Sequence, residues 1–351
     1  MGLYPLKFRA AILQESHKPL VLDDIEFSGP LLTGQVLTKL HYSGICGKQI
    51  DEIDAIAGPD AFLPHLLGHE GCAEVIDIGP GVAKVKKGDT VVMHWRKGSG
   101  IQSSTPMYLR NGSRINAGWV TTFNDYAVVS ENRLTPISIQ EEGDKLIAAL
   151  CGCVVTTGVG VIINEARVQP YDTVVIYGCG GVGLCAVQAA AMIHPRTLIA
   201  IDVNKKSLAI ARDFGATEVF CAHEKDPVKL VLNKTDGKGA SKVIVCTGNP
   251  SAIEKAVDMT SIPGECFFVG VPPKDAKVKI NAHAVMHKRN IRGTLGGDSF
   301  PDRDIPAYFT LHKNEHLHLD KLVSFLGTFT KINEAIDMMR SEAPGRCAIK
   351  F

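Results

Sequence analysis

Hydrophobic and polar positions follow two different patterns along this chain, and the change falls near residue 155. From there to about residue 294, short apolar runs alternate with stretches whose apolar residues recur at helical spacing. The predicted strands are Val174–Tyr177, Leu198–Ile201, Glu218–Phe220, Lys242–Cys246, Cys266–Val271 and Asn290–Thr294. The predicted helices are Gly181–Ile193, Lys205–Phe214, Pro227–Lys234 and Ser251–Thr260. Right-handed crossovers fold such an alternation into a doubly wound parallel sheet, so this half is expected to be α/β.

The first 150 residues predict a β-rich domain, because short strand-like runs are separated by Gly, Pro and Asp and long helical periodicity is scarce. These runs are Phe8–Leu13, Leu20–Ile25, Val36–Tyr42, Gly71–Ile78 and Thr90–Met93. After Thr294 come two helical runs and one strand-like run, Ile305–His312, Asn333–Met339 and Cys347–Phe351. A chain of 351 residues is long enough for two domains, each with its own core.

A G-x-G-x-x-G motif lies between the first strand and the first helix of the alternating half. Gly178 permits a tight turn, Gly180 lets the backbone approach a pyrophosphate, and Gly183 lets helix and strand pack closely. The helix N-terminus, at Gly181 and Val182, offers unpaired N–H groups to the anion. The motif therefore predicts a dinucleotide site.

Asp202 ends the next apolar run, about 20 residues beyond the motif, where a carboxylate is expected to meet the adenosine ribose hydroxyls. It would repel a 2′-phosphate, which favours NAD. Lys205 and Lys206 leave NADP as the alternative. On the competing interpretation, the glycines only mark a turn and Asp202 caps the helix that begins near Lys205.

Composition narrows the class of partner. With 38 Lys and Arg against 37 Asp and Glu, the formal net charge is +1, so no global field attracts nucleic acid or acidic lipid. The N-terminus lacks the apolar stretch of a secretory signal, and the apolar run from Thr173 to Ile193 fits strand, turn and helix better than a membrane span. We therefore expect a cytoplasmic protein whose ten cysteines are reduced.

Three potential metal ligands occur in glycine-rich turns: Cys46 in Gly44-Ile-Cys-Gly, His69 in Gly68-His-Glu-Gly, and Cys153 after Gly152. Two thiolates and one imidazole leave the fourth tetrahedral position of zinc open, which is the arrangement of a catalytic site. The three residues are far apart in the sequence, and each by itself is more often a buried residue of the core than a ligand.

These motifs, in this order ahead of G-C-G-G-V-G, resemble those of the zinc-dependent alcohol dehydrogenases of the medium-chain dehydrogenase/reductase superfamily. The similarity extends over essentially the whole chain, with Gly88-Asp89 and Phe123-Asn-Asp-Tyr126-Ala as further landmarks. The resemblance implies a GroES-like catalytic domain, residues 1–154 and 295–351, interrupted by a Rossmann NAD-binding domain, residues 155–294. A homodimer or homotetramer is expected by the same resemblance.

The resemblance also implies roles for single residues. Cys46, His69 and Cys153 would hold one catalytic zinc, with Cys151 as the competing third ligand, and Glu70 would join the metal transiently or stand just behind it. Val269 and Val271 would face the nicotinamide and Arg346 the pyrophosphate, although Arg346 could equally be a solvated cation. Trp95 and Phe123 fall where the family lines its alcohol pocket, with ordinary core aromatics as the alternative.

The chain departs from the family pattern in two places. No cysteine occurs between Cys72 and Cys151, so the structural zinc of many relatives is not expected, and packing is expected to hold the segment from Trp95 to Trp119 instead. After Cys46, the usual Ser/Thr and Asp are replaced by Lys48 and Gln49, and Asp51 stands where a histidine often ends a proton relay. Lys48 and Asp51 could form a surface ion pair, or they could replace the usual proton relay. In a third alternative, the ammonium of Lys48 binds an anionic group of the substrate.

Together these observations predict a zinc-dependent, NAD-preferring dehydrogenase that acts on an alcohol, including a polyol or sugar derivative, or on the corresponding carbonyl compound. Two alternatives remain at this stage. One is a zinc-free quinone or enone reductase on the same fold, against which the three retained ligands argue. The other is a nucleotide-binding protein that has lost catalysis, which only the altered residues after Cys46 favour.

Overall fold

The computed structural model describes residues 3–341 and 343–351, which form two compact units. The first unit contains the chain up to Cys153 together with Phe300–Phe309 and Val323–Phe351, and the second contains Val154–Ser299 and Thr310–Leu322. The units differ from the ranges expected from sequence at residues 154, 295–299 and 310–322, which belong to the second unit. Two hydrogen bonds explain this difference: Ser299 Oγ donates to Thr156 O, and His318 N–H donates to Gln188 Oε1.

The second unit has the doubly wound sheet that the alternation predicts. Its six strands are all parallel, in the order β13-β12-β11-β14-β15-β16. The strands are β11 (Thr173–Tyr177), β12 (Thr197–Asp202), β13 (Glu218–Cys221), β14 (Ala240–Val245), β15 (Thr260–Phe268) and β16 (Arg289–Gly293). The helices are α3 (Val154–Gly160), the π-helical η2 (Val161–Ala166), α4 (Gly181–Ala191), α5 (Lys205–Asp213), α6 (Pro227–Lys234), α7 (Pro250–Asp258) and α8 (Ala282–Met286).

Local signals in the sequence explain where these helices begin and end. The side chain of Asn204 accepts the N–H groups of Lys206 and Ser207 at the start of α5, and Gly215, with φ of 101°, follows its end. Asp226 caps α6 in the same way, with proline in the first turn. These caps lie close to the predicted boundaries, because capping depends on residues that are neighbours in the sequence.

One strand boundary predicted from the apolar pattern was wrong. The strand expected at Cys266–Val271 begins at Thr260 and ends at Phe268, and the preceding helix ends at Asp258. Thr260 pairs with Ala240 of β14, which starts the strand early. The chain then leaves the sheet near Gly270, where a Cβ atom would lie 2.2 Å from the Thr247 carbonyl carbon.

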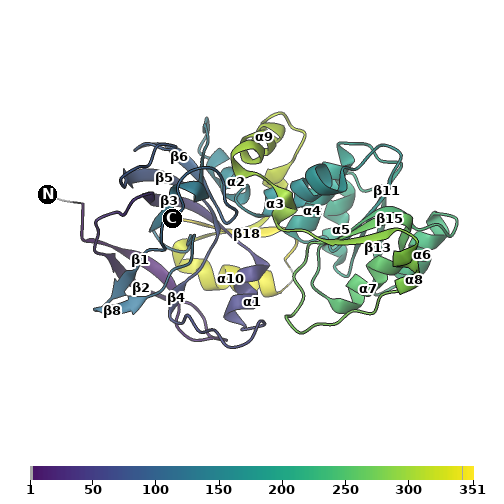
Figure 1. Cartoon of the computed structure of the whole chain (residues 1–351), viewed down its shortest axis with the longest axis horizontal. Coiled ribbons are helices and arrows are strands. Elements are labelled where there is room, and N and C mark those ends of the chain that lie inside the picture. The colour runs from purple at the N-terminus through teal and green to yellow at the C-terminus, as the bar shows by residue number, and fades with distance from the viewer. Residues whose placement is uncertain (1–2, 342) are drawn as a thin grey trace. The chain divides into compact units, whose positions relative to one another are not determined.

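The first unit is built mainly from two β-sheets (Figure 1). One has the order β4-β1-β2-β7-β8, with β1 (Leu6–Leu13), β2 (Val21–Phe27), β4 (His65–Leu66), β7 (Tyr108–Arg110) and β8 (Ser113–Ile115). The other has the order β10-β6-β5-β3-β18-β17, and β9 also pairs with β3. Its strands are β3 (Gln35–Ile45), β5 (Glu70–Ile78), β6 (Thr90–His94), β9 (Tyr126–Ser130), β10 (Leu134–Pro136), β17 (Val323–Thr328) and β18 (Arg346–Lys350).

Strand β18, near the C-terminus, lies between β3 and β17 in this second sheet. It pairs antiparallel with β3 and parallel with β17. Cys347 lies opposite Ile45, so Arg346 comes beside the residues that follow β3. The helices that contribute to this unit are α1 (Gly47–Ile53), α2 (Asp144–Leu150), α9 (Pro301–Lys313, which continues into the second unit) and α10 (Ile332–Arg340).

The segment from Trp95 to Trp119 is held by side-chain hydrogen bonds, and not by packing alone as the sequence suggested. The carboxylate of Glu131 accepts the N–H groups of Ala83 and Lys84 at 2.6 Å and that of Ile101 at 2.8 Å. Asp302 accepts the N–H of Ser99 at 2.6 Å. Arg133 is buried, donates to Trp95 O and to Gln102 Oε1, and lies over the Trp119 ring. Side chains from η1 (Glu131–Arg133) and α9 therefore hold this loop.

All ten cysteines are free thiols. Among the residues that the structure describes, no single helix is long and apolar enough to span a membrane. The bent pair Asp144–Leu150 and Val154–Ala166 meets such a criterion only by its length and composition.

Candidate metal centre

The three predicted ligands converge in the first unit, each at the end of a regular element. Cys46 follows β3 as the N-cap of α1, His69 precedes β5, and Cys153 follows α2. Gly68 has φ of 93°, and a Cβ there would lie 2.2 Å from Thr122 Oγ1. At Gly152 a Cβ would lie 2.3 Å from Met93 O. The glycines beside His69 and Cys153 therefore permit backbone approaches that no other residue allows.

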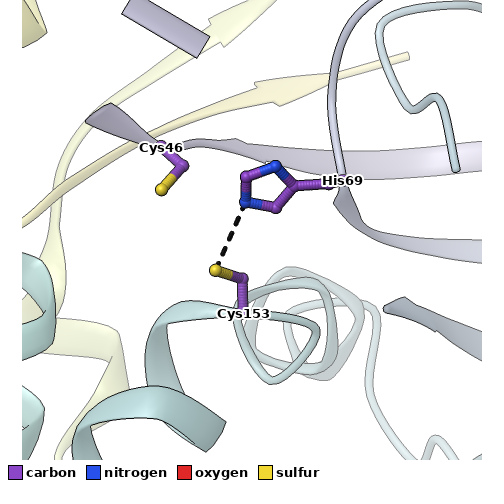
Figure 2. A group of neighbouring side chains, drawn as sticks. All are labelled: Cys46, His69 and Cys153. Atoms are coloured by element: carbon purple, nitrogen blue, oxygen red, sulfur yellow. Dashed lines mark hydrogen bonds between the residues drawn. The ribbon is translucent and has the colours of Figure 1, made fainter. Parts of the chain in front are cut away.

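The potential ligand atoms of Cys46, His69 and Cys153 all lie within 4.8 Å of one another, and His69 Nε2 is 3.3 Å from Cys153 Sγ. Figure 2 shows the two sulfur atoms and the imidazole facing a common space. Zinc with bonds of roughly 2.0–2.3 Å in a tetrahedron separates its ligands by about 3.5–4 Å, so these distances suit that metal. Among the described residues, this is the only such group of three or more potential ligands.

The electrostatics of the cluster favour a thiolate on Cys46. Its pKa lies well below the usual range because the Cys153 thiol hydrogen-bonds to it and because Arg346 and His69 place positive charge nearby, although burial acts in the opposite direction. The same hydrogen bond and burial raise the pKa of Cys153. A metal cation would draw both sulfurs into the deprotonated form, since the thiolate is the form that binds metals.

Glu70 and Arg346 form a buried ion pair behind the cluster. Arg346 Nε donates to Glu70 Oε1 at 2.8 Å, and Arg346 Nη2 lies 2.7 Å from the same oxygen. The two residues are 0% and 3% exposed. Burial disfavours the guanidinium, but Glu70 and Cys46 more than offset it and raise the pKa of Arg346. Arg346 is therefore not a solvated cation. Its predicted contact with a pyrophosphate, and the predicted entry of Glu70 into the metal sphere, stay predictions.

Gln49 is a residue of this centre whose role the sequence analysis missed. It is 1% exposed, its Oε1 accepts the N–H of Cys46 at 2.7 Å, and its Nε2 contacts His69 Nδ1. The spacing Cys46-x-x-Gln49 forms a capping box at the start of α1. That pattern was visible in the sequence and could have placed the amide beside Cys46, whereas nothing in the sequence places it beside His69.

Lys48 and Asp51 lie on α1 and are partly buried, but no ion pair within 4.0 Å joins them in the described part of the chain. Burial raises the pKa of Asp51 and of its neighbour Glu52, while the positive charge of Lys48 opposes the shift of both. The simple surface ion pair is therefore not formed, and the positive charge of Lys48 acts on two carboxyl groups.

The two aromatic residues expected at the alcohol pocket have different surroundings. Phe123 has no exposed surface and belongs to a core cluster with Ile45, Ile53 and Leu67. This position is that of an ordinary aromatic residue of the core, which was the alternative to a role in the alcohol pocket. Trp95 is partly exposed, and its carbonyl accepts from Arg133. A substrate contact by either residue stays a prediction.

The glycine-rich loop of the second unit has the geometry that its motif predicts. Gly178 has φ of 97°, and a Cβ at Gly183 would lie 1.8 Å from Gly178 O, whereas Gly180 is open on its Cβ side. Asp202 Oδ2 accepts the N–H of Cys179 at 2.5 Å, and its Oδ1 accepts the N–H of Asn204 at 2.7 Å. The carboxylate is thus held beside the loop at the carboxyl end of the sheet, where doubly wound folds bind nucleotides.

Two other residues expected at the cofactor follow the carboxyl end of β15. Val269 is partly buried, and Val271 is 66% exposed within the structure as described. Because the strands are parallel, this end of β15 lies on the same edge of the sheet as the glycine-rich loop after β11. A nicotinamide contact by these valines stays a prediction.

Comparison with known proteins links both units to one family. Residues 33–139 match the alcohol dehydrogenase GroES-like domain, and residues 181–313 match the zinc-binding dehydrogenase domain. Alcohol dehydrogenase 6 of Peromyscus maniculatus is 30% identical over 98% of this chain and 98% of its own length. The S-(hydroxymethyl)glutathione dehydrogenase of Escherichia coli is 28% identical over 99% of this chain and all of its own.

Solved structures agree with this assignment of the fold. The crystal structure of benzyl alcohol dehydrogenase from Acinetobacter calcoaceticus superimposes with a TM-score of 0.88, covers 98% of this chain and 99% of its own, and is 26% identical. An alcohol dehydrogenase zinc-binding domain protein from Burkholderia ambifaria gives a TM-score of 0.90 at 24% identity, with 98% and 99% covered. The expected GroES-like and Rossmann architecture is confirmed.

Purified chain should contain one zinc, bound through Cys153 and not Cys151. Cys153→Ala is expected to lose most of the metal, because two protein ligands hold zinc poorly. Cys151→Ala, the matched control, removes a buried thiol outside the cluster and should retain it. Elemental analysis of both variants decides the question. Two zincs per wild-type chain, or metal loss only in the Cys151 variant, would contradict the assignment.

Proposed function

This chain belongs to the zinc-dependent alcohol dehydrogenases of the medium-chain dehydrogenase/reductase superfamily, and on that premise we propose that it transfers a hydride between an alcohol and NAD. A polyol or a sugar derivative is the proposed kind of alcohol. The observation that carries the proposal is the convergence of Cys46, His69 and Cys153 on one point. Three ligands of this kind suit a catalytic zinc, because a fourth position is left for substrate.

The zinc, when bound, would act as a Lewis acid that lowers the pKa of an alcohol hydroxyl or polarises a carbonyl oxygen. The chain contributes the ligands and the charges around them. Cys46, His69 and Cys153 would hold the metal. The Glu70–Arg346 pair behind them places an anion and a cation next to the ligands without exposing either to water. The positive charge of Arg346 helps to lower the pKa of Cys46 and opposes the rise in the pKa of Cys153, so at both sulfurs it acts toward the thiolate, the form that binds metal.

We propose that NAD is the preferred cofactor, because Asp202 is fixed beside the glycine-rich loop with its carboxylate oriented by two backbone N–H groups. A carboxylate there suits ribose hydroxyls and repels a 2′-phosphate. Lys205, one of the two lysines that could favour NADP, forms an ion pair with Glu224 at 2.5 Å. That pair weakens the attraction which Lys205 would otherwise exert on a phosphate.

Turnover is tested with zinc-loaded protein, NAD, and panels of simple alcohols, polyols and sugar alcohols, by following NADH absorbance. We expect NADH formation with at least one alcohol and its loss in Cys153→Ala. Absence of turnover with every alcohol, and with the matching aldehydes and ketones plus NADH, would contradict the proposal. Activity that persists after complete removal of zinc would instead favour the zinc-free reductase.

Asp202→Ala should raise the Michaelis constant for NAD roughly tenfold or more, since a hydrogen bond to a charged group contributes about 1.5–3 kcal/mol. The substitution should also reduce the preference of the enzyme for NAD over NADP. Steady-state kinetics with both cofactors measure these effects. Asp226→Ala is the control, because Asp226 also accepts a backbone N–H but only caps α6. If wild type already prefers NADP, the assignment of Asp202 to the ribose is wrong.

We propose that Lys48 acts with Asp51 at the substrate end of the centre, either passing the alcohol proton or binding an anionic group on the substrate. Lys48 is two residues beyond the proposed ligand Cys46, is partly buried, and is not neutralised by a close ion pair in the described structure. The positive charge of Lys48 opposes the rise that burial causes in the pKa of Asp51 and of Glu52.

Lys48→Met separates the two roles. A relay role predicts a changed pH profile of kcat with an uncharged alcohol, whereas an anchoring role predicts a raised Michaelis constant only for the ω-carboxylate analogue of that alcohol. Lys39→Met removes an exposed lysine of β3 and serves as the control. If Lys48→Met leaves the pH profile and both Michaelis constants unchanged, Lys48 takes part in neither step.

A further inference from the structure

Gln49 connects two of the three metal ligands through a single buried amide. Its Oε1 accepts the backbone N–H of Cys46 at 2.7 Å, and its Nε2 contacts His69 Nδ1. The side chain is 1% exposed, so water cannot readily replace either partner.

The chemistry of the partners fixes which way this amide points. A backbone N–H can only donate, so the atom that faces Cys46 must be the amide oxygen. The amide nitrogen then faces His69, and it too can only donate. His69 Nδ1 must therefore accept, which leaves the ring proton on Nε2. Nε2 is the nitrogen that lies 3.3 Å from Cys153 Sγ, on the side of the ring that faces the two sulfur atoms (Figure 2).

A metal on Nε2 requires the opposite arrangement. The imidazole binds metal through an unprotonated nitrogen, so the ring proton must then sit on Nδ1, where it needs an acceptor. Both Cys46 N–H and His69 Nδ1–H then require the one oxygen that the amide possesses. The amide must turn its oxygen toward His69 and lose Cys46, or move so that one oxygen serves both donors.

We propose that Gln49 is a positioning residue that limits the metal affinity of this centre, because loading the metal forces its amide to reorient between Cys46 and His69. The proposal rests on the zinc site of the proposed function. A carboxylate of the same shape has two acceptor oxygens, one for each donor, and adds a negative charge that suits a metal-bound imidazole. Glutamine at this position thus gives a weaker-binding centre than glutamate would.

The experiment compares zinc affinity in wild type, Gln49→Glu and Gln49→Met by competition with a chromophoric chelator. Partners that orient a metal-bound histidine typically change metal affinity 10–100-fold. We expect Gln49→Glu to bind zinc about tenfold or more tightly than wild type, and Gln49→Met about tenfold more weakly. Gln188→Glu is the matched control: Gln188 is also buried and its Oε1 accepts one backbone N–H, but it touches no ligand.

A second readout follows the amide and the ring directly. Nitrogen NMR of the metal-free and zinc-loaded wild-type protein reports which nitrogen of His69 is protonated and whether the Gln49 side-chain signals move. We expect the proton on Nε2 without metal and on Nδ1 with it, accompanied by a shift of the Gln49 amide. This measurement needs no variant, so it decides the question even if Gln49→Glu fails to fold.

The outcomes separate this inference from the proposed function. If wild type binds no zinc, both are overturned. If wild type binds zinc but neither Gln49 variant changes the affinity, only the role of Gln49 is wrong, and the residue is a helix cap and no more. A Gln49 amide that does not respond to zinc in the NMR experiment would overturn the proposed reorientation, and an equal gain in affinity in Gln188→Glu would show a general charge effect.

Discussion

The first unit depends on burying one guanidinium among negative groups. Arg346 is almost fully enclosed, and an isolated charge in that position would cost several kcal/mol. Glu70 on β5 and the sulfur of Cys46 after β3 supply the compensating charge. Because Arg346 begins β18, the pairing of this strand near the C-terminus with β3 delivers the cation to the metal centre. The pairing of β18 with β3 therefore places Arg346 beside Cys46 and Glu70.

Acidic side chains also hold the segment from Trp95 to Trp119, which contains no cysteine. Glu131 accepts hydrogen bonds from three backbone N–H groups in two separate loops. Asp302 of α9 accepts one from Ser99 in the segment. Hydrogen bonds between backbone N–H groups and ionised carboxylates are among the stronger ones in proteins. Two acidic side chains therefore provide a polar attachment for the loop.

The second unit relies on close backbone approach more than on charge. Gly183 allows α4 to pack against the turn after β11, and Gly178 makes that turn with a positive φ. Asp202 then ties the end of β12 to the same turn through the N–H of Cys179. The glycine-rich loop and the carboxylate of Asp202 are in this way fixed to each other.

Sequence alone predicted most of the secondary structure and, through the resemblance to a known family, three candidate metal ligands that the structure brings together. The periodicity of strands and helices, the helix caps and the glycine motif all depend on residues that are close together in the sequence. They can therefore be recognised without knowledge of the fold. The boundaries of β15 were missed because its start is set by pairing with Ala240 and its end by the approach of Gly270 to Thr247. Those constraints join residues that are distant in the sequence.

Only the tertiary structure decided how the ligands are supported. The sequence showed that Lys48 and Gln49 follow Cys46, but not that the Gln49 amide also reaches His69, or that Lys48 and Asp51 form no ion pair. Nor did it show that Arg346 is paired with Glu70, 276 positions away. Hydrogen bonds and buried charges depend on atoms within a few ångströms of each other. Residue type and the family motifs point to the candidate ligands, whereas the groups that contact them become visible only when distant strands are brought together.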